Sequence, residues 1–434
     1  MTKSRMSLML IALSVTLIAS ISIGLFQESE AVKGQGTYLP RTGSANSPVC
    51  GDRLCSEVEK TAPIPKSSHA TSQSQSLSQK IAQTTCDTSE GTVRTYYIAA
   101  DEVVWDYAPA GINQMKGHQF NEDENVFVEN TPDRIGSKYI KALYREYIDD
   151  TFSELKTRTS EWEHLGTLGP IMHAEVCDTI KVVFKNNSVE HNFSVHPHGV
   201  FYEKDSEGAE YNDGSSDSTK VDGIVEPGQI HTYSWPVPPR AGPGPNDPSS
   251  IIWMYHSHVD SPADTNSGLV GPMVVTAKGM ADENGRPLDV DREFVSLFTV
   301  NDENTSNYLC DNLEEFTDET CDNGELVEDE DFAESNLMHG INGYVYGNLP
   351  GQTMKNGEHV RWYLIGMGTE VDLHTPHWHG NTVLWNGNRV DVMELMPASL
   401  KTVDFIPDNV GTWMFHCHVN DHISAGMMSL FTVV

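Results

Sequence analysis

The chain has 434 residues, of which 62 are acidic and only 28 are Lys or Arg, so its formal net charge is −34 at pH 7. A surface this negative keeps a protein soluble and argues against binding to the phosphates of nucleic acids. It also attracts cations, although solvation in a saline environment would favour the same composition.

Residues 1–26 have the polarity of a secretion signal, because Lys3 and Arg5 precede a mainly apolar run from Met6 to Phe26. The run is long for a cleaved signal peptide and long enough to cross a bilayer, and no clear small-x-small cleavage site follows it. We therefore expect either a signal peptide or an N-terminal membrane anchor. Both place the protein outside the cytoplasm, as a secreted, periplasmic or outward-facing anchored protein.

Residues 27–90 are rich in Ser, Thr, Pro and Gln and show little apolar periodicity, which predicts a flexible spacer. Cys50 and Cys55 interrupt this spacer. Their close spacing indicates a small disulfide loop or, as the alternative, a minor metal site.

The cysteine count also favours an oxidising compartment. Of seven cysteines, Cys417 is set aside below as a metal ligand, and the remaining six are an even number suited to disulfides. Cys310 and Cys321 bracket an acidic stretch and are expected to close a loop. Cys86 and Cys177 then remain as a pair.

After the spacer the pattern is that of an all-β protein. Short runs rich in β-branched and aromatic residues, many of them separated by Gly, Pro or Asn, predict strands in a sandwich. One helical excursion is expected over residues 138–155, and the polar segment 279–287 is the expected domain junction. We predict two Greek-key β-sandwich domains, residues 91–279 and 288–434. The runs are Thr92–Ile98, Thr179–Phe184, Gly271–Thr276, Glu293–Phe298, Val360–Ile365 and Met428–Val433.

Histidines recur in His-x-His pairs along these domains. With 18 histidines, roughly one such pair is expected by chance, and a lone pair would be a weak motif. Alternation along a strand places both imidazoles of a pair on one face, where each can reach a metal. Eight imidazoles suit a cluster of three copper ions with positions left for dioxygen. There are four pairs: His196/His198, His256/His258, His377/His379 and His416/His418.

The segment from His416 to Met427 adds a different kind of metal site. A Cys thiolate with His and a weak thioether is the ligand set of a blue electron-transfer copper. Cys417, His422 and Met427 supply three of these ligands, and His374, just before the third histidine pair, supplies the fourth. The histidines on both sides of Cys417 then indicate a second copper centre that receives electrons through it.

The first domain lacks its own blue site. Ser257 stands where the thiolate would be needed, Pro262 where the later histidine would be, and Phe193 three residues before His196. We therefore predict one blue copper per chain.

From about Gly91 to Val434, the chain resembles the ceruloplasmin, hephaestin and coagulation factor V/VIII group of multicopper oxidase domains. The segments His198–Lys204, Tyr255–Asp260 and Gly366–His374 carry the likeness. The resemblance implies two cupredoxin-like domains and four copper ions per chain, with the type 1 copper in the second domain. It assigns the type 1 copper to His374, Cys417, His422 and Met427, the type 2 copper to His196 and His377, and the type 3 pair to His198, His256 and His418 and to His258, His379 and His416.

The same resemblance implies the reaction. One-electron donors are oxidised at the type 1 copper, Cys417 passes the electrons to His416 and His418, and the cluster reduces dioxygen to water. Asp260 is a candidate proton donor, although its plainer interpretation is a turn residue. Because each domain carries half of the cluster histidines, we expect a closed homotrimer with clusters between neighbouring chains.

The donor is the least determined part of the prediction. Glu334, His339 and Asp421 match a labile iron site of ceruloplasmin, and such ligands suit Fe(II) or Cu(I) awaiting oxidation. A laccase-like oxidase of phenols would share every copper ligand. Nitrite reductase or hydroxylamine chemistry also remains open, although a copper nitrite reductase carries its blue-site Cys in the first domain. A non-catalytic protein like the clotting cofactors would be expected to have lost ligands.

Overall fold

The computed structural model describes residues 49–50, 53–54, 86, 91–216, 220–321, 326–369 and 372–434. The contacts divide the chain into two units, Met1–Gln75 and Ser76–Val434. In the first, β1 (Val49–Cys50) pairs antiparallel with β2 (Arg53–Leu54). The predicted leader, most of the spacer and a bond between Cys50 and Cys55 lie outside the described residues. Within the described part, no helix is long and apolar enough to cross a membrane.

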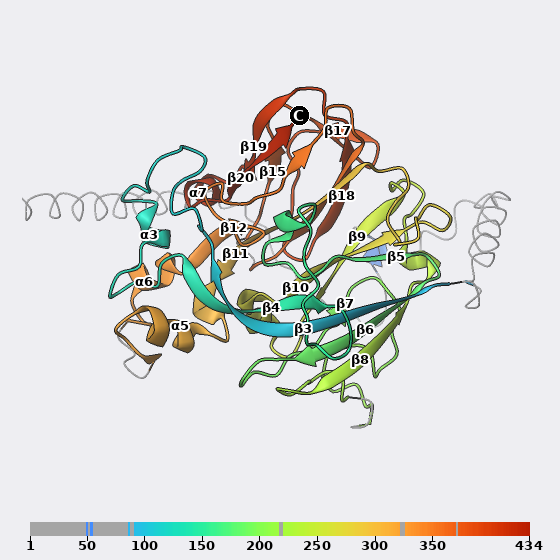
Figure 1. The fold of residues 1–434 in the computed structure, drawn as a ribbon. Coiled ribbons are helices and arrows are strands. Elements are labelled where there is room, and N and C mark those ends of the chain that lie inside the picture. The colour runs from blue at the N-terminus through green and yellow to red at the C-terminus, as the bar shows by residue number, and fades with distance from the viewer. Residues whose placement is uncertain are drawn as a thin grey trace, which may run out of the picture. The chain divides into compact units, whose positions relative to one another are not determined.

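Two four-stranded sheets form the first half of the second unit (Figure 1). Their facing sides bury a core that includes Phe184, Tyr233, Trp235 and Met273. One sheet has the order β4-β3-β6-β8 and the other β5-β10-β9-β7. The strands are β3 (Val93–Asp106), β4 (Lys138–Tyr147), β5 (Met172–Glu175), β6 (Thr179–Asn186), β7 (His196–Pro197), β8 (Ile230–Pro236), β9 (Ser250–His256) and β10 (Val270–Thr276).

A six-stranded and a four-stranded sheet form the second half. Phe294, Trp362, Phe415 and Phe431 are among the residues of their shared core. The sheet orders are β12-β11-β14-β18-β16-β17 and β13-β20-β19-β15. The strands are β11 (Arg292–Asp302), β12 (Leu337–Ile341), β13 (Thr353–Met354), β14 (Val360–Gly366), β15 (Pro376–Trp378), β16 (Val383–Trp385), β17 (Asn388–Val390), β18 (Leu400–Phe405), β19 (Gly411–Cys417) and β20 (Met428–Val433).

The described helices are all short and lie at loops and sheet ends. Three of them, α3, α5 and α6, gather at one side of the molecule (Figure 1), over a small core that contains Phe127, Leu313 and Phe332. The helices are α3 (Asn125–Val128), η2 (Glu163–Leu165), η4 (Pro239–Ala241), α4 (Ser261–Ser267), η5 (Glu303–Thr305), α5 (Leu309–Phe316), α6 (Glu330–Ser335) and α7 (Asn420–Ser424).

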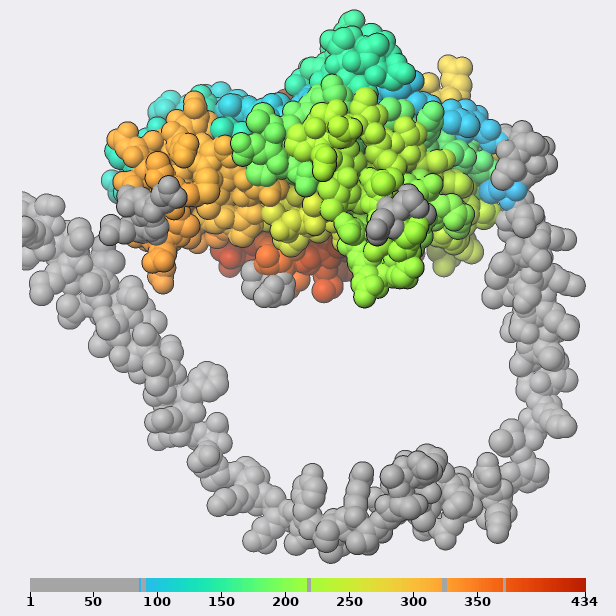
Figure 2. All heavy atoms as spheres, turned by 90° about the horizontal axis from the view of Figure 1, so that it is seen from below, coloured from blue at the N-terminus to red at the C-terminus, as the bar shows by residue number. Residues whose placement is uncertain are grey.

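The two halves share a buried boundary. A further apolar core joins Ile252 and Val274 of the first half to Val295 and Ile365 of the second. In the space-filling view, green first-half residues lie directly against orange and red second-half residues (Figure 2). This boundary holds the site-bearing elements of the two halves in place.

The all-β expectation is confirmed. Five of the six predicted strand runs fall within observed strands, and the sixth, Thr92–Ile98, begins one residue before β3. The disulfides Cys86–Cys177 and Cys310–Cys321 are also confirmed. The helix expected over residues 138–155 is wrong, because Lys138–Tyr147 forms β4 and pairs with β3 along its whole length. The division at residues 279–287 stays a prediction, although β10 ends before this segment and β11 begins after it.

Candidate metal centres

Three of the predicted blue-site ligands converge in the second half. The donor atoms of His374, Cys417 and His422 all lie within 4.8 Å of one another, and all three residues are buried. Cys417 is the last residue of β19, and His422 lies on α7, which follows directly. Met427 is fully buried and tied to both, because its N–H donates to the His422 carbonyl and its own carbonyl accepts the Cys417 N–H.

The surroundings fix which atoms face the site. The Nε2 atom of His374 lies 3.2 Å from the Met367 carbonyl, so this nitrogen carries the proton and Nδ1 keeps its lone pair. That Nδ1 is buried and has no hydrogen-bond partner within the described residues. The Nδ1 atom of His422 lies 3.6 Å from the Cys417 sulfur. A buried nitrogen without a partner, close to a thiol and a second imidazole, is the arrangement that a bound copper would complete.

Burial also determines the charge state of these ligands. It raises the pKa of the Cys417 thiol and lowers the pKa of His374 to about 4. His374 is therefore neutral near pH 7 and able to donate its lone pair to a metal. The thiolate of Cys417 needs a neighbouring cation, which supports a metal at this position.

Three of the first-half histidines form one group. Donor atoms of His196, His198 and His256 lie within 4.8 Å of one another, and the Nε2 atoms of His198 and His256 are 3.2 Å apart. The Nδ1 atom of His196 lies 2.6 Å from the Glu207 carbonyl, and that of His256 lies 2.8 Å from the Ser257 carbonyl. These carbonyls hold the proton on Nδ1 and leave Nε2 free for a metal.

The second-half histidines repeat the pattern. His377, His379 and His416 form a group of the same kind. His377 faces His416 across the β15–β19 pair, and the Nε2 atoms of His379 and His416 are 3.1 Å apart. The Nδ1 atom of His416 lies 2.6 Å from the Cys417 carbonyl, so its Nε2 is left free.

Each half has four predicted cluster histidines, called its quartet below: His196, His198, His256 and His258 in the first half, and His377, His379, His416 and His418 in the second. One histidine of each quartet lies next to the converging group but is not part of it. The His258 ring is 5.1 Å from that of His196, and the His418 ring is 5.4 Å from that of His377. Neither joins the donor atoms that converge within 4.8 Å. Among the described residues, no ring contact joins one quartet to the other. The two quartets are therefore separate groups among the described residues.

The first half has no blue site at the equivalent position. Phe193 and Ser257 are completely buried. The Ser257 hydroxyl donates to Asp264 at 2.6 Å, and Pro262 is the second residue of α4. The predicted proton donor Asp260 is exposed, and its side chain makes no cap hydrogen bond with α4.

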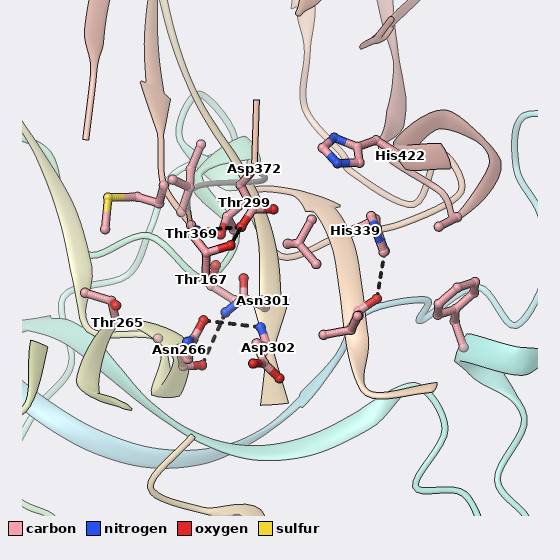
Figure 3. Close-up of a pocket in the computed structure, with 18 of the residues that line it drawn as sticks. Thr167, Thr265, Asn266, Thr299, Asn301, Asp302, His339, Thr369, Asp372 and His422 are labelled. Carbon is pink, nitrogen blue, oxygen red and sulfur yellow. Dashed lines mark hydrogen bonds between the residues drawn. The ribbon is translucent and has the colours of Figure 1, made fainter. Parts of the chain in front are cut away.

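The predicted cation ligands line one cavity above the blue site. This cavity of about 810 Å³ opens between the two halves, and Glu334, His339, Asp421 and His422 line it (Figure 3). The His339 and His422 rings are 5.3 Å apart. Glu334, His339 and Asp421 are not among the described groups whose donor atoms converge within 4.8 Å.

Sequence analysis did not single out the further acidic residues of this cavity. Asp123, Asp302 and Asp372 also line it. Asp372 is 5% exposed, and one of its oxygens accepts hydrogen bonds from Thr369. Its position two residues before His374 was the available signal, but a carboxylate beside a ligand is too common in so acidic a chain to stand out.

Comparison with known proteins shows the family of this chain. Two multicopper oxidase family profiles match residues 164–280 and 323–434, which contain all twelve predicted copper ligands. The chain belongs to the multicopper oxidase family. It is 46% identical over 349 residues to human Ferroxidase HEPHL1 and 43% identical over 348 residues to human Ceruloplasmin. Each match covers 79% of this chain, which spans 29% and 32% of the two relatives.

A solved structure supports the fold alone. The multicopper oxidase mgLAC matches with a TM-score of 0.51 at 17% sequence identity. The match covers 79% of this chain and 86% of the other. It confirms cupredoxin-like sandwiches.

Proposed function

We propose that this multicopper oxidase couples one-electron oxidation of a metal ion, Fe(II) or Cu(I), to the reduction of dioxygen to water. The observation that carries the proposal is the position of Cys417, which is a buried blue-site donor lying directly between two cluster histidines. Copper bound at the two kinds of site would supply one-electron redox chemistry and deliver four electrons to each dioxygen.

The chain itself provides the path between the two centres. Cys417 is covalently continuous with His416 and His418, and β19 holds His416 opposite His377 of β15. The N–H of Thr375 donates to the Cys417 sulfur at 3.3 Å, and the hydroxyl of Thr375 accepts from the His418 N–H at 3.0 Å. These bonds fix the sulfur and both flanking residues in one arrangement.

The cavity above the blue site favours a cation as the donor. Carboxylates of Glu334, Asp372 and Asp421 line it together with the His339 imidazole. Burial lowers the pKa of His339 to about 4, so its ring is neutral and able to bind a divalent metal. Its ring contact with His422 supports binding of the cation next to a blue-site ligand. The names of the ferroxidase and ceruloplasmin relatives support the same choice.

The donor assignment is tested by replacing His339 with Ala and Glu334 with Gln. We expect the KM for Fe(II) to rise about tenfold, since a lost ligand weakens binding of the ion, while turnover of a phenol is unchanged. Glu330→Gln is the matched control, because it removes the same charge from α6 outside the cavity lining. An equal loss on Fe(II) and on the phenol would indicate laccase-like use of the blue site.

The incomplete convergence of each quartet supports clusters that are shared between chains. His258 and His418 lie outside their own converging groups, and the family assignment gives each to a copper held mainly by the opposite quartet. A first half of one chain facing a second half of the next would supply all eight histidines. Repeated head to tail, this contact closes a ring, for which we propose a homotrimer.

The cofactor count and the compartment are part of the same proposal. One blue copper and three cluster coppers per chain follow from the twelve ligands. The two disulfides support a compartment outside the cytoplasm, where such bonds persist.

A further inference from the structure

The first half keeps the hydrogen-bonded frame of a blue site without its ligands. In the second half, the Thr375 N–H donates to the Cys417 sulfur and the His418 N–H donates to the Thr375 hydroxyl. In the first half, the Ser194 N–H donates to the Ser257 hydroxyl at 3.1 Å, and the His258 N–H donates to the Ser194 hydroxyl at 3.0 Å. The same two bonds therefore hold the same two backbone segments in both halves.

The two halves differ in the group that links these hydrogen-bonded segments to the following helix. In the second half a bound copper would link the thiol of Cys417 to His422 on α7. In the first half the matching positions are Ser257 and Pro262, which offer no such link. A carboxylate occupies this place instead, because Asp264 on α4 is 1% exposed and bonded to the Ser257 hydroxyl.

The Asp264 carboxylate accepts four hydrogen bonds. Its Oδ2 accepts from the Ser257 hydroxyl at 2.6 Å and from the backbone N–H groups of Val259 and Asp260, both at 3.1 Å. Its Oδ1 accepts from the side-chain amide of Asn307, in the second half, at 3.0 Å. All four donors are neutral, so the carboxylate is held in the interior by hydrogen bonds alone.

These contacts lie on both sides of His258. One oxygen atom holds residue 257 before it and residues 259 and 260 after it, while the carbonyl of Ser257 fixes the proton of the His256 ring. The chain is therefore restrained on both sides of His258. A ligand held in one geometry loses less entropy on binding a metal.

We propose that Asp264 is the positioning residue of the first-half cluster ligands, taking over in this half the structural role that copper has in the blue site. It sets the orientation of His256 and His258 without touching the metal. The inference rests on the proposed copper cluster and adds a residue outside the histidine motifs.

The test compares Asp264→Ala with Asp264→Asn in the full-length protein after copper loading. We expect Asp264→Ala to keep the blue absorbance per chain and to lose at least half of the remaining copper, measured by elemental mass spectrometry and by the paramagnetic resonance of type 2 copper. Asp264→Asn should restore the copper, because its amide oxygen accepts the bonds from residues 257–260 and the Asn307 amide can turn to match.

Asp178→Ala is the matched control. Asp178 is 3% exposed and accepts three hydrogen bonds, from the Thr92 N–H, the Arg94 side chain and the Glu175 N–H. This variant shows how the loss of a buried carboxylate elsewhere in the first half affects the copper content. We expect no selective loss of copper from the cluster.

Full cluster copper in Asp264→Ala, or equal proportional loss of blue and cluster copper, would overturn the inference. If Asp264→Ala does not fold, Ser257→Ala removes one of the four bonds and is expected to cause a smaller loss of the same kind, and full retention there would also overturn it. An unmodified protein without cluster copper would instead refute the proposed function.

Discussion

At the scale of the residue, the metal ligands are set apart by the restraints around them. In four of the histidines, one ring nitrogen donates a hydrogen bond to a backbone carbonyl, which leaves the other nitrogen free to bind a metal. These are His196, His256, His374 and His416. Such second contacts fix the tautomer before a metal arrives. We expect the sites to be largely formed without copper.

Replacing Cys417 with Ser tests the proposed electron path. The change removes the only described thiol outside a disulfide and keeps the side chain nearly the same size. We expect the blue absorbance to disappear and the oxidase rate to fall by about a thousandfold or more, because removal of a unique reaction component is far costlier than loss of one hydrogen bond. Circular dichroism should be unchanged, and retained oxidase activity would contradict the path.

His164 makes the stability of the protein depend on pH. It is fully buried, and burial lowers its pKa to about 4 from 6.5. Its Nε2 accepts from the Val295 N–H at 3.1 Å, which requires the neutral ring. A histidine with a lowered pKa contributes its full stability above pH 6.5 and loses it as the pH falls toward 4, here roughly 3 kcal/mol.

The check is denaturant unfolding of the copper-free protein and of His164→Gln at several pH values. The Gln side chain offers an oxygen to the Val295 N–H but does not titrate. The difference in unfolding free energy between the two proteins should shrink as the pH falls from 6.5 to 4. A constant difference would show that His164 does not titrate on unfolding.

Residue types explain which site members could be predicted from the sequence. Histidine and cysteine are far fewer than acidic residues in the chain, so their spacing carried information. Three of the four predicted blue-site ligands and three histidines of each half do converge in space. Asp264 and Asp372 are two of 62 acidic residues. Their role depends on burial and on hydrogen bonds from distant residues, which spacing does not reveal.

At the scale of the element, β4 shows why tertiary contacts can override a local pattern. Its sequence allowed a helix, but it forms the edge strand that pairs with β3 and carries Lys141, which is completely buried. Lys141 forms an ion pair with Glu303, which is also completely buried, and donates to the Asn266 carbonyl at 2.7 Å. The partner of Lys141 lies 162 residues later, so no local window could have indicated it.

Replacing Lys141 with Met should destabilise the protein by roughly 3–5 kcal/mol, because it leaves the Glu303 carboxylate buried without its cation. The double variant Lys141→Met with Glu303→Gln should recover most of this loss, since the neutral amide can still accept from Tyr107, whose hydroxyl donates to Glu303 at 2.5 Å. Denaturant unfolding of the copper-free variants measures both. Equal stability of the single and double variants would contradict a coupled pair.

At the scale of the whole molecule, each half of the chain carries four cluster histidines on the strands of its own sheets or just beyond their ends. β7 and β9 hold the first quartet, while β15 and β19 hold the second in another part of the fold (Figure 1). The sequence predicted the two halves and their ligands. It could not determine how copies meet, because an interface depends on surface shape rather than on spacing.

Shared clusters predict complementation between two inactive variants. His256→Ala damages the first quartet, and His379→Ala damages the second. In a closed ring of three chains that contains both variants, about one cluster in three is assembled from two undamaged halves. We expect doubly tagged mixed rings to recover about a third of the oxidase rate, while each variant alone stays inactive. No recovery in purified mixed rings would place the cluster within one chain.

The central claim is that electrons from Fe(II) enter through Cys417 and leave on dioxygen four at a time. The most direct measurement is the ratio of Fe(II) oxidised to dioxygen consumed by the copper-loaded protein, followed together with its blue absorbance. The account predicts four Fe(II) per dioxygen, with the blue colour bleached by Fe(II) without air and restored by dioxygen. A ratio near two with hydrogen peroxide released, or a blue colour that Fe(II) does not bleach, would contradict it.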